Sequence, residues 1–229
     1  MKRGNDTGRH PSGPPSGGYG VGRAAINLLL LLALLMPGLS NAAEKRLLLL
    51  GDSLTAGYGL PAEDGFAAQL QRALTARGHD VQVLDAGVSG DTSAGGLARL
   101  GWSLADKPTH AVVELGANDA LRGLPPGAME QNLDQIIEQL KAAGAKVLLV
   151  GMKAPLNLGP EYQQAFEGAY RNLSEKHSVA LYPFFLEGLV GRRDLMLGDG
   201  LHPNADGVAL IVENILPAIE TLLEEGESS

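Results

Sequence analysis

Short apolar runs alternate with stretches of helical period along residues 44–222, and this alternation limits the folds open to the chain. Five runs have the length and character of strands: Leu47–Leu50, Val81–Leu84, Ala111–Leu115, Val147–Val150 and Val179–Leu181. The first and fourth are nearly continuous in apolar residues, as expected of strands that helices cover on both faces. Strands that alternate with helices predict a parallel sheet in an α/β fold.

Three intervening stretches place apolar residues three and four positions apart, as on one face of a helix. These stretches are Phe66–Leu74, Met129–Leu140 and Val208–Leu222. Gly144 is the predicted stop of the second helix, and Asn204 and Asp206 are candidate N-caps of the third. With right-handed crossovers, this order gives a doubly wound, three-layer α/β/α sandwich in a single domain.

The amino-terminal residues have the pattern of a secretory signal peptide. A polar region with four basic residues precedes the apolar stretch Ala24–Met36, and small residues follow in Ser40–Ala43. A basic region, a short apolar region and a small-residue site are typical of export signals. We expect residues 1–43 to be removed after Ala42 or Ala43, which predicts a periplasmic or secreted protein; an uncleaved anchor is the alternative.

Composition excludes several classes of function. The 229 residues carry a net charge of −8, and removal of residues 1–43 leaves 14 Lys and Arg against 25 Asp and Glu, or −11. This charge argues against nucleic-acid binding and against a polybasic membrane anchor. There is no cysteine, so disulfides, thiolate catalysis and thiolate metal sites are excluded. We expect one domain at 44–223, a flexible tail at 224–229 and a monomer.

Ser53 follows the first apolar run and precedes a glycine-rich turn, so it is a candidate nucleophile. A hydroxyl nucleophile needs a base, and an imidazole base benefits from a carboxylate that fixes its tautomer. Asp199 and His202 supply both, three residues apart near the end of the chain. The order Ser, Asp, His matches α/β-hydrolases, but their Gly-x-Ser-x-Gly elbow is absent.

Polar loops follow the first three predicted strands, and the carboxyl ends of parallel strands meet at one sheet edge. Acyl transfer needs donors aimed at the developing oxyanion. Gly90 offers an unobstructed backbone N–H, Asn118 offers a side-chain amide, and the Ser53 N–H at the start of a helix is the third candidate. Asn118 as a plain loop residue is the alternative interpretation.

Four blocks of this chain resemble, in order, the blocks of the SGNH, or GDSL, hydrolases. They are Gly-Asp-Ser-Leu at 51–54, Gly90 in Ser-Gly-Asp-Thr-Ser, Gly-Ala-Asn-Asp at 116–119 and Asp-Gly-Leu-His-Pro at 199–203. Residues 113–123 and 181–185 are similar to the periplasmic acyl-CoA thioesterase/lysophospholipase/arylesterase subgroup. The departure is Ala117, where this subgroup often has glycine.

The resemblance implies a nucleophile at Ser53, a base at His202 and an orienting carboxylate at Asp199. It implies oxyanion donors from Ser53, Gly90 and Asn118, a flavodoxin-like five-stranded sheet of order 2-1-3-4-5, and neither metal nor cofactor. The implied activity is hydrolysis of carboxylic esters and thioesters through an acyl-enzyme, with lysophospholipid, aryl or acyl esters as substrates.

Several other residues near these blocks have expected places and roles. Tyr58 is expected at the rim of the site, and the loop at 152–162, with Pro155 and Leu156, is expected to wall the acyl pocket. Glu114 is expected to pair with a donor such as Arg122. Asp52 and Asp119 are expected to be structural. The three histidines outside the site are expected at the surface: His79, His110 and His177.

Three other functions are alternatives to the esterase. A flavodoxin-like phosphate binder would use the same sheet edge but has no need of the Asp199 and His202 pair, and the loop lacks the lysine of a P-loop. A non-catalytic envelope protein would not require the full set of site residues. A sugar-deacetylating enzyme of the same family would prefer acetyl esters.

Overall fold

The computed structural model describes residue 13 and residues 45–225. The predicted signal segment 1–43, apart from residue 13, lies outside the described residues, as do residues 226–229 of the predicted tail. Residues 45–225 form a five-stranded parallel sheet of order β2-β1-β3-β4-β5, which confirms the predicted order. The strands are β1 (Lys45–Gly51), β2 (Val81–Gly87), β3 (His110–Glu114), β4 (Lys146–Val150) and β5 (Ala180–Tyr182).

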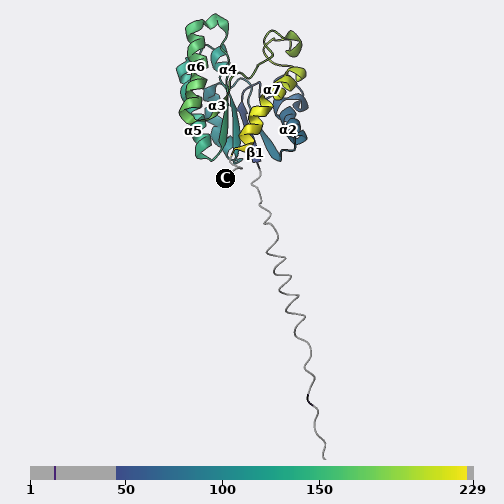
Figure 1. Ribbon diagram of the computed structural model, residues 1–229. Helices are drawn as coiled ribbons and strands as arrows, with labels where there is room; N and C mark the ends of the chain where they lie inside the picture. The colour runs from purple at the N-terminus through teal and green to yellow at the C-terminus, as the bar shows by residue number, and fades with distance from the viewer. Residues whose placement is uncertain (1–12, 14–44, 226–229) are drawn as a thin grey trace, which may run out of the picture. The chain divides into compact units, whose positions relative to one another are not determined.

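Helices cover both faces of this sheet and complete the predicted three-layer sandwich (Figure 1). One face is covered by α3 (Ser93–Leu104), α5 (Pro126–Ala142) and α6 (Pro160–His177), with the short α4 (Ala117–Leu121) beside α5. The other face is covered by α2 (Phe66–Ala76) and α7 (Ala205–Glu224). Short 3-10 turns lie at Ala62–Asp64, Leu156–Leu158 and Arg193–Leu195.

The core is centred on β1, whose leucines at 47–50 are at most 1% exposed. Successive side chains of a strand point to opposite faces, so four consecutive buried leucines require cover on both sides. The two flanking helix layers supply that cover. The edge strand β2 is less buried along its length.

The strand register aligns the ends of the sheet that carry the predicted site. Gly51 of β1 pairs with Gly87 of β2 and with Glu114 of β3, and Glu114 pairs with Val150 of β4. All four strands therefore end at the same level. The strand order reverses between β1 and β3, and such a switch point is where doubly wound sheets bind ligands.

Helix ends follow the predicted signals in most places. Asn204 caps α7 by accepting the Gly207 N–H at 3.0 Å, while Asp206 lies in the first turn. Gly144 follows α5 with a φ of 86°, as a C-terminal stop requires. Helix α7 includes Glu224, one residue beyond the predicted domain boundary.

Two predictions about surface and loops are wrong. His110 and His177 are only 4% and 9% exposed: His110 is the first residue of β3, inside the sheet, and His177 ends α6, where its Nε2 contacts Asp134 of α5 at 2.6 Å. Residues 160–162 belong to α6 rather than to a loop, since Pro160 is favourable at a first helical position. Among the described residues, no helix has the length and apolar character needed to cross a membrane.

Candidate active site

The nucleophile candidate lies in a tight turn at the end of β1. Ser53 is 9% exposed, and its neighbours form a single helical turn in which the Ala56 N–H donates to the Asp52 carbonyl at 3.0 Å. The turn ends at Gly57, whose φ of 68° favours glycine, and α2 begins only at Phe66. The prediction that a helix starts at Ser53 is therefore wrong, and its N–H projects from a turn.

Asp199 and His202 meet Ser53 in one chain of hydrogen bonds. The His202 Nε2 lies 2.9 Å from the Ser53 Oγ, and the His202 Nδ1 lies 2.7 Å from the Asp199 Oδ2. The other oxygen, Asp199 Oδ1, accepts the N–H groups of Leu201 and His202 at 2.9 and 3.1 Å. The bond from His202 and these backbone donors lower the pKa of Asp199 to about 2. Asp199 is thus a carboxylate that can hold an imidazole in one orientation.

Three polar donors border the Ser53 hydroxyl. Among residues 45–225, no acceptor is bonded to the N–H of Ser53 or of Gly90. Gly90 has a φ of 87°, which favours glycine. The third donor, Asn118 Nδ2, gives one hydrogen to the Asp52 Oδ2 at 3.0 Å, and its second hydrogen has no acceptor in this part of the chain. The donors expected from the sequence therefore stand together beside Ser53.

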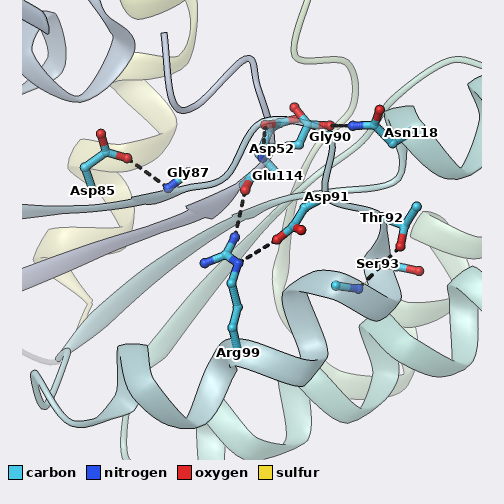
Figure 2. Close-up of polar contacts among 12 residues, drawn as sticks. Asp52, Asp85, Gly87, Gly90, Asp91, Thr92, Ser93, Arg99, Glu114 and Asn118 are labelled. Carbon is cyan, nitrogen blue, oxygen red and sulfur yellow. Dashed lines mark hydrogen bonds and ion pairs between the residues drawn. The ribbon is translucent and has the colours of Figure 1, made fainter. Parts of the chain in front are cut away.

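Two arginine side chains hold the loop that carries Gly90, and Figure 2 shows the first of them, Arg99. Arg99 joins two segments, because its Nε donates to Asp91 Oδ2 at 2.6 Å and its Nη2 to the Gly51 carbonyl at 2.9 Å. Arg122 donates to the Gly90 carbonyl at 2.6 Å. The expected pairing of Arg122 with Glu114 is therefore wrong.

The short helix α4 is fixed to α3 by Asp119. Its carboxylate accepts the Ser93 N–H at 2.8 Å and the Ser93 hydroxyl at 2.6 Å. This confirms the predicted structural role of Asp119. Because Asn118 is its neighbour in α4, the same contact fixes the backbone that carries the amide donor.

The Ser53 hydroxyl opens into a cavity of about 390 Å³. Its lining residues are Asp52, Ser53, Leu54, Tyr58, Ser89, Gly90, Ala117, Asn118, Leu121, Met152, Lys153, Pro155, Leu186, Leu201 and His202. Tyr58 contacts the candidate base, with its ring centroid 4.5 Å from that of His202. Pro155 lines the cavity as expected, whereas Leu156 lies outside it and is 86% exposed.

Sequence reasoning missed the four leucines of this cavity, of which Leu54 adjoins Ser53. Leu121 lies one helical turn after Asn118, so the helical spacing of α4 is a signal that identifies it. Leu201 adjoins His202 and was detectable by adjacency alone. Leu186 comes from the loop after β5, and nothing in its local sequence marks it.

One group of side chains outside this site has the composition of a cation site. Oxygen and nitrogen atoms of Asp134, Glu138 and His177 lie within 4.8 Å of one another. The Lys176 ammonium already contacts Asp134 at 2.6 Å, and the His177 Nε2 contacts the same carboxylate at 2.6 Å. These contacts join α6 to α5, and none of these residues lines the cavity at Ser53.

Comparison with known proteins identifies the family. Residues 49–210 match the GDSL-like lipase/acylhydrolase family. The chain belongs to this family. It is accordingly an ester hydrolase of the SGNH/GDSL class, and the matched segment contains all the residues of the site described above.

Several named proteins resemble this chain over most of their length. Esterase TesA of Pseudomonas aeruginosa is 45% identical over 184 residues, which cover 80% of this chain and 92% of that protein. Thioesterase 1/protease 1/lysophospholipase L1 of Escherichia coli K12 is 40% identical over 183 residues, covering 80% and 86%. A crystal structure of the psychrotrophic esterase EstA from Pseudoalteromonas sp., inhibited by monoethylphosphonate, matches with a TM-score of 0.76 at 38% identity, covering 79% and 100%.

Proposed function

We propose that this GDSL hydrolase is an exported serine esterase that works through an acyl-enzyme on Ser53. The observation that carries the proposal is the hydrogen-bonded chain from Ser53 through His202 to Asp199, with distances of 2.9 and 2.7 Å, at the wall of the cavity. A nucleophile, a base and an orienting carboxylate in this order are the parts that acyl transfer requires.

In the proposed acylation, the Ser53 Oγ attacks the carbonyl carbon of the ester while His202 Nε2 takes the hydroxyl proton. Asp199 keeps the proton on Nδ1, so Nε2 is free to accept. The oxyanion forms between the N–H groups of Ser53 and Gly90 and the Asn118 amide. His202 then gives its proton to the leaving oxygen, and the carbon–oxygen bond breaks.

Deacylation reverses these roles. Water enters beside His202, which removes a proton as the water oxygen attacks the acyl carbon. The same three donors hold the second oxyanion. His202 returns the proton to Ser53 Oγ, and the carboxylic acid leaves.

We propose that the acyl group carries an apolar chain rather than acetyl alone. The cavity volume of about 390 Å³ is near the lower end of the volumes that are usual for small-molecule binding sites. Leu54, Leu121, Met152, Leu186 and Leu201 supply apolar wall, which disfavours the sugar-deacetylating alternative. Lysophospholipids, aryl esters and thioesters are the proposed substrate class, in line with the names of the relatives.

The proposal is tested with p-nitrophenyl esters of increasing chain length, beside lysophosphatidylcholine and an acyl-CoA. Ser53→Ala should abolish turnover of every substrate while the unfolding temperature stays unchanged. Retained turnover in this variant contradicts the nucleophile, and a rate that falls beyond acetyl supports the deacetylase. For the export proposal, amino-terminal sequencing of the mature protein should begin after Ala42 or Ala43; a start at Met1 contradicts it.

A further inference from the structure

Two carboxyl groups lie directly behind the oxyanion donors and have no part in the proposed proton transfer. Asp52 is 0% exposed and Glu114 is 1% exposed. Glu114 pairs with Gly51 across the β1–β3 register, and a Cβ at Gly51 would stand 2.8 Å from Glu114 Oε2. The missing side chain at Gly51 therefore leaves room for Thr55, whose Oγ1 would be 1.9 Å from that Cβ, and for the buried glutamate.

The hydrogen-bond partners of these carboxyl groups leave one oxygen unsatisfied. Glu114 Oε2 accepts the Thr55 hydroxyl at 2.9 Å and the Asp52 N–H at 3.4 Å. Asp52 Oδ1 accepts the Leu54 N–H at 3.0 Å, and its Oδ2 accepts the Asn118 amide at 3.0 Å. Glu114 Oε1 is buried without a donor from any described residue. A buried ionised carboxylate with an unpaired oxygen is costly, so a proton is needed here.

Electrostatics indicate which carboxyl group holds that proton. Burial raises the pKa of Glu114 well above its usual range, and repulsion by the Asp52 carboxyl raises it further. Burial also raises the pKa of Asp52, to about 6, against the lowering effect of the Leu54 N–H and the Asn118 amide. Each carboxylate oxygen of Asp52 accepts a donor, which favours its charged form, whereas Glu114 Oε1 is buried without one among the described residues, which favours the neutral form of Glu114.

We propose that Asp52 and Glu114 share one proton, and that the pair positions the Asn118 amide for the oxyanion. Neutral Glu114 donates to Asp52, and the Asp52 carboxylate accepts from Asn118 Nδ2. A carboxylate only accepts, so it selects the amide orientation in which Nδ2 faces the site and rejects the flipped one. This inference rests on the proposed role of Asn118 as an oxyanion donor, and it makes Asp52 and Glu114 positioning residues.

The neutral state of Glu114 also has an electrostatic consequence. Two ionised carboxylates behind the donors would oppose the negative charge that develops on the substrate oxygen, because the buried site screens charge weakly. A single proton halves that opposing charge. The proposed pair therefore fixes the Asn118 amide and also reduces the repulsion between the buried carboxyl groups and the oxyanion.

A double-mutant cycle tests the positioning role. Asp52→Asn should lower kcat about tenfold or more with KM within about twofold, because the new side chain can present an amide group to Asn118. In the Asn118→Ala background, the same change should lower kcat by less than about twofold. Fully additive losses overturn the inference. An unchanged kcat in Asn118→Ala alone contradicts the proposed oxyanion donor instead, so the two failures are distinguishable.

Infrared spectroscopy and a matched pair of variants test the proton. The wild-type protein at neutral pH should show a buried carboxylic-acid stretching band that is absent from Glu114→Gln; its absence from the wild type overturns the shared proton. Glu114→Gln should keep at least about tenfold more turnover than Glu114→Leu, because the amide can replace the neutral acid as donor to Asp52 and as acceptor from Thr55. Equal turnover in the two variants overturns the inference.

Discussion

The two sides of the catalytic site are built in different ways. The nucleophile and oxyanion side stands at the ends of buried strands, where Asp52 and Glu114 are almost completely inaccessible to solvent. The base side is a surface loop: the Asp199 side chain is 37% exposed, and the His202 side chain 18%. Both sides contribute to the same hydrogen-bonded chain, although one is part of the core and the other lies over it.

This difference matches what each side is proposed to do. Oxyanion donors act only if they are in place before charge develops, and packing against a sheet provides that fixed geometry. The base needs one ring orientation, which Asp199 and the loop backbone provide locally. The loop is held by the Leu197 N–H, which donates to the His202 carbonyl at 2.7 Å, and by a bridge between Met196 and Pro203. We therefore expect substitutions that add side-chain volume to be disruptive on the strand side. Substitutions that remove a charge should be disruptive on the loop side.

The largest expected effect is on the loop side. Asp199→Asn should lower kcat about 10⁴-fold, because an amide no longer enforces the tautomer that leaves Nε2 free. Unfolding by urea should change little, since Asp199 is at the surface. The matched control is Asp194→Asn on the same loop, which loses only an exposed ion pair with Arg192 and should keep the wild-type kcat. Similar losses in both variants would remove Asp199 from the triad.

A smaller effect is expected from added volume on the strand side. Gly116 has a φ of 120°, and a Cβ there would lie 2.1 Å from the Tyr170 hydroxyl oxygen. Gly116→Ala should therefore lower the free energy of unfolding by about 3 kcal/mol, from overpacking and backbone strain together.

Gly123→Ala is the matched control for this volume effect. Gly123 also has a positive φ, of 61°, but open space surrounds its Cβ position. Strain alone should cost this variant about 1 kcal/mol. Chemical denaturation measures both changes. If the two variants lose the same free energy of unfolding, crowding by Tyr170 is not what constrains Gly116.

The smallest effect is the response to acid, and both sides should contribute to it, because burial raises the pKa of Asp52 to about 6 and its protonation would weaken the contact that positions the Asn118 amide. On the loop side, His202 must be neutral to accept the Ser53 proton, so kcat/KM should fall as the pH is lowered. Asp199, with a pKa of about 2, stays ionised through this range and does not cause the loss. A pH profile on an uncharged ester measures the slope; a rate that is flat to about pH 4 contradicts an imidazole base.

The strand side could be predicted from sequence more completely than the loop side. Apolar runs predicted the positions of β1 and β3. Parallel strands that end at one edge of the sheet bring Ser53, Gly90 and Asn118 together. The contacts behind them could not be predicted, because they depend on register: Glu114 meets Thr55 and Asp52 rather than Arg122. A one-residue change in register would have pointed Glu114 to the other face.

On the loop side, short-range spacing identified the residues of the proposed triad but not the shape of the cavity. Asp199 and His202 interact three residues apart, so their pairing is visible in the sequence. Leu186 and Leu156 lie in loops whose paths have no periodic signal, and only the fold places the first inside the cavity and the second outside. The start of α6 at Pro160, which helps to set that path, was also missed.

The central claim is that the acyl group becomes attached to the Ser53 Oγ. Mass spectrometry after reaction with a p-nitrophenyl alkylphosphonate tests it most directly, because the phosphorus forms a stable bond to an activated serine. We predict one adduct per chain, on the peptide that contains Ser53, with esterase activity lost in proportion to labelling and with no adduct in Ser53→Ala. Loss of activity with the adduct on another residue, or labelling that Ser53→Ala retains, would contradict the account.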